Sequence, residues 1–143
     1  MNPKYDGIDH INVYSKGKTQ LGRWLTNFAH TPFYHIYHGQ FQSVEGYWYW
    51  LSTNDDKLRE LHGWQAKKYG KSVRGKDWPE DVNFQNHIKV ALYCKIVQNE
   101  KIKQEFFKND LPLDHYYVYG DRVVSVPEGR WILETLESIK GIL

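Results

Sequence analysis

The chain has 143 residues, a formal net charge of +2 and 41% hydrophobic residues, with aromatic residues alone making up 16%. This length predicts one domain, and the balanced charge argues against a disordered chain and against a protein dedicated to coating DNA. A mean hydropathy of −0.71 without a long apolar run argues against a membrane span, and no secretory signal is visible. Because Cys94 is the single cysteine, no internal disulfide is possible, and we expect a cytoplasmic protein.

The first half of the chain predicts a strand, a hairpin and two helices. Residues 10–15 alternate polar and apolar side chains, as a short strand does, and residues 33–42 are typical of a hairpin. Ser43 is expected to cap a helix rich in aromatic residues. Asn54 is expected to cap a second helix, for which Gly63 would be the C-terminal stop.

Helical spacing dominates the next part of the chain. Apolar residues recur at helical spacing from near Asp81 to Ile96, and Lys95 falls on another face of that helix. Residues 102–107 continue a helical face, which Pro112 then breaks.

The last part of the chain predicts two paired strands and a helix. Residues 116–119 and 122–126 read as strands joined by a turn, and a final amphipathic helix begins near Gly129. The predicted fold class is therefore α+β, mostly helical, with a small antiparallel sheet.

Glu45 is the first candidate for chemistry, because it would lie in the first turn of the helix that Ser43 caps. A helix N-terminus stabilises a carboxylate by about 0.3–1 kcal/mol, so we expect Glu45 to stay ionised. That state suits a base, a nucleophile or a cation stabiliser, and does not suit a general acid. The alternative is an ordinary acidic residue at a helix start.

Asp114 is the second candidate, because it precedes an aromatic segment at residues 115–119. A second carboxylate close to Glu45 would form a pair, and paired carboxylates cleave glycosidic bonds. The alternative is a cap or turn residue after Pro112. The sequence alone does not place the two carboxylates within reach of each other.

Aromatic and basic residues gather in the same regions. Flat rings stack nucleobases, at about 1–3 kcal/mol per base, although core packing is the alternative for most of them. The aromatic candidates are Trp24, Phe28, Trp48, Trp50, Tyr117 and Tyr119. A basic stretch could bind phosphates, or it could be a solvated face. It consists of Lys67, Lys68, Lys71, Arg74 and Lys76, and the four-residue spacing puts Lys67 and Lys71 on one helix face.

The histidines are not expected to bind a metal. His30, His35 and His38 match no zinc-ligand spacing, and on a strand His35 and His38 would face opposite sides. Cys94 lies within an apolar helical run and reads as an inert buried thiol.

The order of short motifs resembles the NADAR domain, also called YbiA-like. The motifs are Tyr14-Ser15, Leu25-Thr26-Asn27-Phe28, Pro32, Gly39, Ser43-Val44-Glu45, Ala66 to Lys71, Trp78, Ala91-Leu92-Tyr93-Cys94-Lys95 and Asp114 to Gly120, before a closing amphipathic helix. They span nearly the whole chain, so the resemblance implies a single YbiA-like domain over residues 1–143.

The resemblance implies an N-glycosidase without a cofactor, a hydrolase acting on the N-ribosyl bond of an ADP-ribosyl or phosphoribosyl compound. Glu45 and Asp114 would be its catalytic carboxylates, and Asn27 and Phe28 would lie beside the ribose and the base. Trp48, Trp50 or Tyr117 would stack the leaving base, and Lys67, Lys68, Lys71 or Arg23 would neutralise phosphates. The expected partner is a nucleotide or an ADP-ribosylated nucleic acid, and not a membrane.

Two departures from the family pattern keep other functions open. Ser52 stands where the family has a lysine after the glutamate, and Tyr117 takes the place of a tryptophan. A protein that binds a nucleotide or ADP-ribose without cleaving it is the first alternative, and a small protein-interaction domain is the second. The compact sequence also resembles copies carried by bacteriophages, for which the location would be the host cytoplasm.

Overall fold

The computed structural model describes residues 1–75 and 83–142. The chain divides into two compact units. Unit 1 joins Met1–Thr26 to Lys101–Leu143, and unit 2 is the continuous segment Asn27–Glu100. The single domain expected over residues 1–143 stays a proposal.

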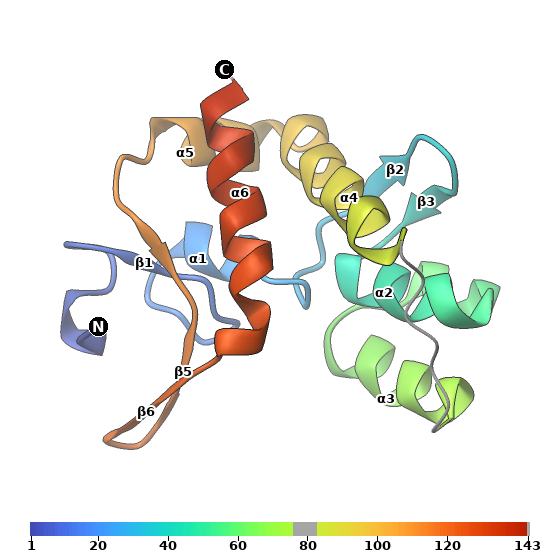
Figure 1. Ribbon diagram of the computed structural model, residues 1–143, viewed down its shortest axis with the longest axis horizontal. Helices are drawn as coiled ribbons and strands as arrows, with labels where there is room; N and C mark the ends of the chain where they lie inside the picture. The colour runs from blue at the N-terminus through green and yellow to red at the C-terminus, as the bar shows by residue number, and fades with distance from the viewer. Residues whose placement is uncertain (76–82, 143) are drawn as a thin grey trace. The chain divides into compact units, whose positions relative to one another are not determined.

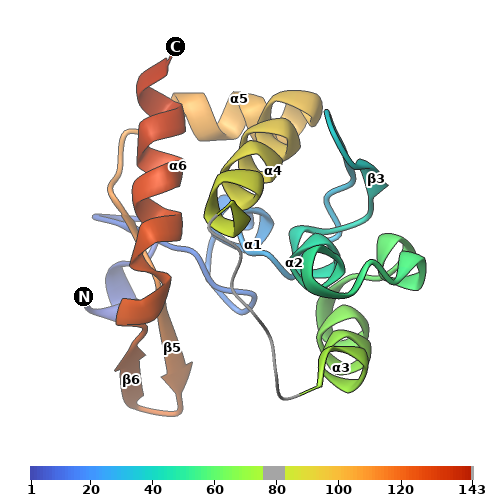
Figure 2. The same ribbon diagram turned by 45° about the vertical axis from the view of Figure 1, so that its right-hand side comes forward.

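Unit 2 consists of a hairpin followed by helices (Figure 1). Its elements are β2 (Phe33–His35), β3 (Gly39–Phe41), α2 (Val44–Thr53), the 3₁₀ helix η2 (Asp56–Glu60), α3 (Gly63–Arg74) and α4 (Phe84–Gln98). The strands β2 and β3 pair antiparallel, with Phe33 opposite Phe41, so the predicted hairpin is confirmed. Figures 1 and 2 both show α3 running beside α2, and the two helices are in contact. The fully buried large side chains of unit 2 include Phe33, Phe41, Tyr47, Leu58, Ile88 and Leu92.

The sequence prediction around Asn54 is wrong. Asn54 ends α2 in the left-handed conformation, with φ at 55°, and its N–H donates to the Trp50 carbonyl. Asparagine tolerates this conformation better than most residues, which suits it to a C-terminal cap. Asp55 caps the 3₁₀ helix instead, and Gly63 begins α3 rather than stopping a helix.

Helix α4 is buried on more than one face. Phe84, Ile88 and Ala91 are buried as predicted, but Lys95 is also buried, at 1% exposure, so the prediction that it lies on another face is wrong. Burial lowers the pKa of Lys95 to about 7, because desolvation penalises its charged form. The expected helix start at Asp81 lies outside the described residues, as do the candidates Lys76 and Trp78.

Unit 1 contains the remaining elements. They are the 3₁₀ helix η1 (Pro3–Tyr5), β1 (Ile11–Asn12), α1 (Gln20–Trp24), α5 (Glu100–Lys108), β4 (Leu113–Asp114), β5 (Tyr116–Tyr119), β6 (Arg122–Ser125), the 3₁₀ helix η3 (Pro127–Gly129) and α6 (Arg130–Ile142). The predicted antiparallel pair of β5 and β6 is confirmed, with Tyr119 opposite Arg122. The parallel pair of β1 and β4 was not predicted. The buried side chains of unit 1 include Ile102, Phe106, Tyr116, Leu136 and Ile139.

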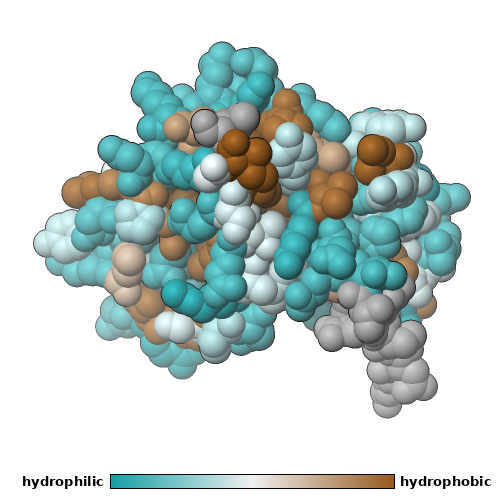
Figure 3. Space-filling model, turned by 45° about the horizontal axis from the view of Figure 1, so that its top comes forward, coloured by the Kyte–Doolittle hydropathy of each residue, from teal (hydrophilic) through white to brown (hydrophobic). Residues whose placement is uncertain are grey.

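The structure confirms the predicted class, α+β and mostly helical with small antiparallel pairs. None of the described helices combines the length and the apolar character that a bilayer crossing needs. On the face drawn in Figure 3, hydrophilic residues predominate and apolar side chains lie scattered among them.

Candidate functional site

The start of α2 positions Glu45. The Ser43 hydroxyl accepts a hydrogen bond from the Gly46 N–H at 3.0 Å and donates to the Leu61 carbonyl at 2.8 Å, so the predicted cap is confirmed. The N–H of Glu45 donates to the Asn27 carbonyl at 2.9 Å, which places these two residues next to each other. The Asn27 side-chain oxygen is buried and has no hydrogen-bond partner. A buried oxygen of this kind is ready to accept from a ligand.

The carboxyl group of Glu45 is not fully ionised at neutral pH. Burial raises its pKa to about 7, although the charges of Lys67 and Lys71 act in the opposite direction. The expectation that Glu45 stays ionised is therefore not met, because desolvation outweighs the helix N-terminus and both lysines. With this pKa, both protonation states are populated at neutral pH, and the group can accept or donate a proton.

Helix α3 brings the basic residues to Glu45. A Cβ on Gly70 would lie 2.2 Å from the ring of Tyr49, so the missing side chain allows α3 to approach α2 closely. The charges of Lys67 and Lys71 both lower the pKa of the Glu45 carboxyl. This agrees with the prediction that the two lysines share one face of the helix. Lys68 is exposed, which is typical of a residue on a solvated helix face.

Trp64 is a candidate that the sequence reasoning missed. Trp64 is 71% exposed, and its ring meets the ring of Phe28 edge-on, with 5.8 Å between centroids. The Lys67 ammonium lies 5.1 Å from the Trp64 ring and 5.8 Å from the Phe28 ring. A tryptophan three residues before Lys67 in the same helix was the available signal. We call Asn27, Phe28, Glu45, Trp64, Lys67 and Lys71 the Glu45 cluster.

The tryptophans of α2 have different surroundings. Trp48, three residues after Glu45, packs edge-on against Phe84 with 4.7 Å between centroids. The Trp50 indole N–H donates to Asp56 at 3.0 Å, and the guanidinium of Arg59 lies 4.8 Å from its ring. These contacts are those of packed rings, and a role for either tryptophan in stacking a base stays a prediction.

The other predicted residues belong to unit 1. Asp114 lies in β4, and its carboxylate accepts from the His115 N–H at 2.8 Å. Tyr117 packs against Tyr14, with 5.6 Å between centroids. The guanidinium of Arg23 donates to the Gly17 carbonyl at 2.7 Å. A pairing of Asp114 with Glu45 therefore stays a prediction.

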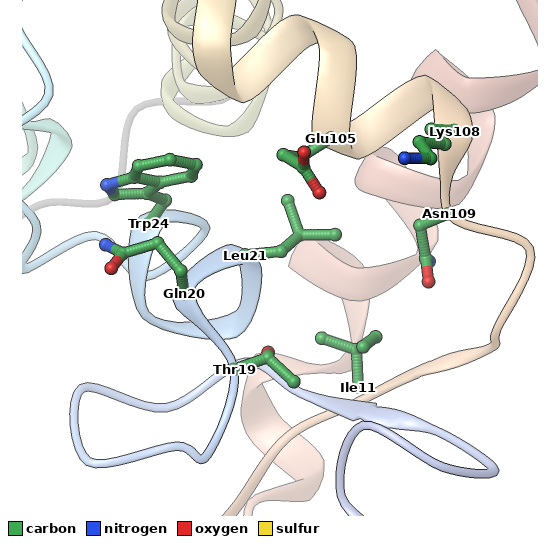
Figure 4. Close-up of a pocket in the computed structure, with 8 residues that line it drawn as sticks. All are labelled: Ile11, Thr19, Gln20, Leu21, Trp24, Glu105, Lys108 and Asn109. Carbon is green, nitrogen blue, oxygen red and sulfur yellow. The ribbon is translucent and has the colours of Figure 1, made fainter.

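Unit 1 also contains a pocket of about 480 Å³ (Figure 4). It is lined by Ile11, Thr19, Gln20, Leu21, Trp24, Glu105, Lys108 and Asn109. Trp24 is one of the aromatic residues that the sequence offers for stacking a base, whereas neither Glu45 nor Asp114 lines this pocket.

Three histidines of unit 2 come together, contrary to the sequence prediction. His35 ends β2 and His38 lies in the turn before β3, so the alternation of a strand does not separate them. One ring nitrogen each of His35, His38 and His87 lies within 4.8 Å of the others. Burial, followed by the charge of His38, lowers the pKa of His35 to about 4, and burial also lowers the pKa of His38. His30 is elsewhere and stacks on His62, with 4.3 Å between ring centroids.

Comparison with known proteins finds a similar fold in a solved structure. No protein-family model and no curated protein matches the chain. An NMR structure of the E. coli protein YbiA is similar with a TM-score of 0.66, over 99% of this chain and 92% of that one. The two sequences are 18% identical, a level at which similarity concerns the fold. The chain therefore has the YbiA-like fold that the order of its sequence motifs predicts.

Proposed function

We propose that the chain is an N-glycosidase that hydrolyses the N-ribosyl bond of an ADP-ribosyl or phosphoribosyl compound. The observation that carries this proposal is the partly buried carboxyl group of Glu45 at the start of α2, whose pKa is raised to about 7. The same cluster holds an unpartnered amide oxygen, two lysines and the ring pair of Phe28 and Trp64, of which Trp64 is exposed. The resemblance of the sequence motifs to the NADAR family supports the same activity.

The reaction replaces the bond between the anomeric carbon and nitrogen by a bond to water. As the carbon–nitrogen bond breaks, its electron pair leaves with the nitrogen and positive charge develops on the ribose ring. Ionised Glu45 stabilises this charge, orients the attacking water and takes the proton that the water loses. The proton that Glu45 takes from the water passes to the leaving nitrogen, directly or through solvent, so the hydrolysis balances without a redox cofactor. Asp114 is proposed as the second carboxylate, or as the residue that holds the ribose hydroxyls.

The Glu45 cluster offers a group for each part of such a substrate. The buried Asn27 oxygen accepts a hydrogen bond from a ribose hydroxyl, and the edge-on rings of Phe28 and Trp64 offer a surface for the base. Lys67 and Lys71 offer positive charge for phosphates. The proposed partners are a free nucleotide and an ADP-ribosylated nucleic acid.

The test incubates the full chain with ADP-ribosylated nucleoside, ADP-ribosylated DNA, NAD and a phosphoribosylamino pyrimidine, and follows products by chromatography and mass spectrometry. We expect release of ADP-ribose or ribose phosphate from one of them. Glu45→Gln should lower the rate by about 10²–10⁴-fold. Glu60→Gln is the matched control, because Glu60 is an exposed glutamate of the same unit. Full activity of Glu45→Gln would overturn the mechanism.

Binding without cleavage is the second candidate, and the environment of Ser52 favours it. Ser52 stands at the position of the family lysine, and its hydroxyl donates to the Tyr49 carbonyl of its own helix at 3.1 Å. That position therefore supplies no positive charge. Recovery of the compound intact, with a raised melting temperature in both wild type and Glu45→Gln, would identify a binding protein.

A further inference from the structure

We propose that His35, His38 and His87 form a binding site for one divalent transition-metal ion, with Zn²⁺ as the expected occupant. The ion would tie the turn between β2 and β3 to helix α4. Imidazole nitrogens suit zinc, and three histidines are sufficient for a site whose fourth position is held by water. This inference concerns a different part of unit 2 from the Glu45 cluster and does not depend on the proposed glycosidase activity.

The geometry is close to that of a metal site. One nitrogen of each ring lies within 4.8 Å of the other two. In a tetrahedral site with Zn–N distances of about 2.0–2.1 Å, ligand nitrogens are about 3.3–3.4 Å apart. The rings therefore need to approach by at most about 1.5 Å. His38 and His87 are only partly buried, so rotation of their side chains supplies this movement.

His38 already has the second contact that orients a ligand. Its Nδ1 lies 2.6 Å from the hydroxyl of buried Tyr47. With the proton on Nδ1, His38 donates to the Tyr47 oxygen and keeps the lone pair of Nε2 for a metal. A hydrogen bond of this kind to the far nitrogen is usual for histidine ligands, because it fixes the tautomer and the ring orientation.

His35 supplies the buried side of the site. Its ring is fully buried, and its Nε2 has no hydrogen-bond partner. Its Nδ1 accepts from the Tyr37 N–H at 3.1 Å. Coordination through Nε2 requires a proton on Nδ1, so the Tyr37 amide must turn away when the ion binds. Tyr37 is 73% exposed, and water can satisfy the amide after this change.

Arg59 is the charged group that opposes a cation at this site. Its guanidinium donates to the His38 carbonyl at 2.6 Å and also contacts the Asp56 carboxylate at 2.9 Å. Asp56 offsets part of this charge, so Arg59 weakens the site without blocking it.

The experiment titrates the full chain with Zn²⁺ by calorimetry and with Co²⁺ by visible absorption. We expect one ion per chain and the d–d bands of a tetrahedral cobalt site. His87→Asn and His38→Asn should each weaken binding by at least about 100-fold, more than the loss of a supporting contact does. His62→Asn is the matched control, because it removes an exposed imidazole of the same unit. Circular dichroism checks that each variant is folded.

Two further measurements make the result specific. His87→Cys should restore Co²⁺ binding and add a thiolate-to-cobalt charge-transfer band, which places the ion at residue 87. The Tyr37 amide should shift in the NMR spectrum on Zn²⁺ addition in the wild type and not in His87→Asn. Absence of a one-to-one complex, binding that survives both His87→Asn and His38→Asn, or binding lost with His62→Asn would overturn the proposal.

Discussion

The raised pKa of Glu45 lowers the stability of the folded state at neutral and alkaline pH, although the same carboxyl group is the proposed catalytic residue. The unfolded chain loses the Glu45 proton near the ordinary pKa of 4.5, whereas the folded chain keeps it up to about pH 7. The folded state binds more protons between these values, so this residue lowers stability as the pH rises from 4.5 to 7. Above pH 7 the Glu45 carboxyl is ionised in both states, so it lowers the stability no further.

Replacement of Glu45 by glutamine should therefore stabilise the protein at alkaline pH. We expect Glu45→Gln to raise the free energy of unfolding by about 1–3 kcal/mol at about pH 8 and to change it little at about pH 4. Denaturant unfolding of wild type and variant across this pH range measures the difference. Glu60→Gln should show no such trend, and an equal stability of Glu45→Gln and wild type at the alkaline end would contradict a raised pKa.

Lys67 should set the pH at which Glu45 ionises. Its positive charge lowers the pKa of Glu45, so Lys67→Gln should raise that pKa further. The acidic limb of the rate profile then moves to higher pH. We also expect KM to rise by about two- to fivefold, the equivalent of one exposed ion pair with a phosphate.

Carbon-13 NMR of the Glu45 carboxyl measures this shift whether or not turnover is observed. Lys68→Gln is the matched control, because Lys68 is exposed and does not act on Glu45. A titration of Glu45 that is identical in Lys67→Gln and wild type would show that the two groups are not coupled.

At the scale of elements, the contact of α2 with α3 depends on Gly70. A Cβ at this position would lie 2.2 Å from the Tyr49 ring, and Tyr49 is buried. Gly70→Ala should destabilise the protein by about 1–3 kcal/mol, because overpacking outweighs the better helix propensity of alanine. In α6, Gly141→Ala meets no neighbouring atom and should be neutral or stabilise by up to about 1 kcal/mol. Thermal unfolding compares the two, and equal effects would contradict a tight contact at Gly70.

The elements that local sequence determines were the ones that could be predicted. Ser43 caps α2 because its own hydroxyl reaches the Gly46 N–H, and this contact spans three residues. The β5–β6 hairpin likewise needs only neighbouring residues. The parallel pair of β1 and β4 joins residues about a hundred positions apart, and each strand has only two residues, so no periodic pattern indicates it. Lys95 was misplaced because helical spacing does not tell how many faces of a helix are covered.

The same distinction applies to the candidate site. The sequence could single out Glu45 by its place at a helix start, and Lys67 and Lys71 by their four-residue spacing. Both signals are local. The unpartnered Asn27 oxygen depends on the packing around α2, and the histidine cluster needs His87 from a helix about 50 residues after His35. Contacts of this range are set by tertiary packing, which one sequence does not reveal.

At the scale of the whole molecule, the two proposed catalytic carboxylates come from different units. Unit 1 is assembled from residues 1–26 and from residues 101 onward. The amide of Asn12 joins these segments, since it donates to the Tyr116 carbonyl and accepts from the Tyr116 N–H, each at 3.0 Å. Asp114 is next to this junction, in the strand that pairs with β1, whereas Glu45 belongs to the inserted unit 2.

A double-mutant cycle tests whether Glu45 and Asp114 act on the same bond. If Glu45 and Asp114 act on the same bond, Glu45→Gln and Asp114→Asn should each lower kcat/KM by about 10²–10⁴-fold, and the double variant should lose little more than the worse single one. Asparagine keeps the oxygen that accepts from the His115 N–H, so the variant preserves the local structure. Asp121→Asn in the exposed β5–β6 turn is the control, and its small effect should multiply with that of Glu45→Gln. If the losses at Glu45 and Asp114 multiply as well, the carboxylates act independently, and unit 2 has to supply the chemistry without Asp114.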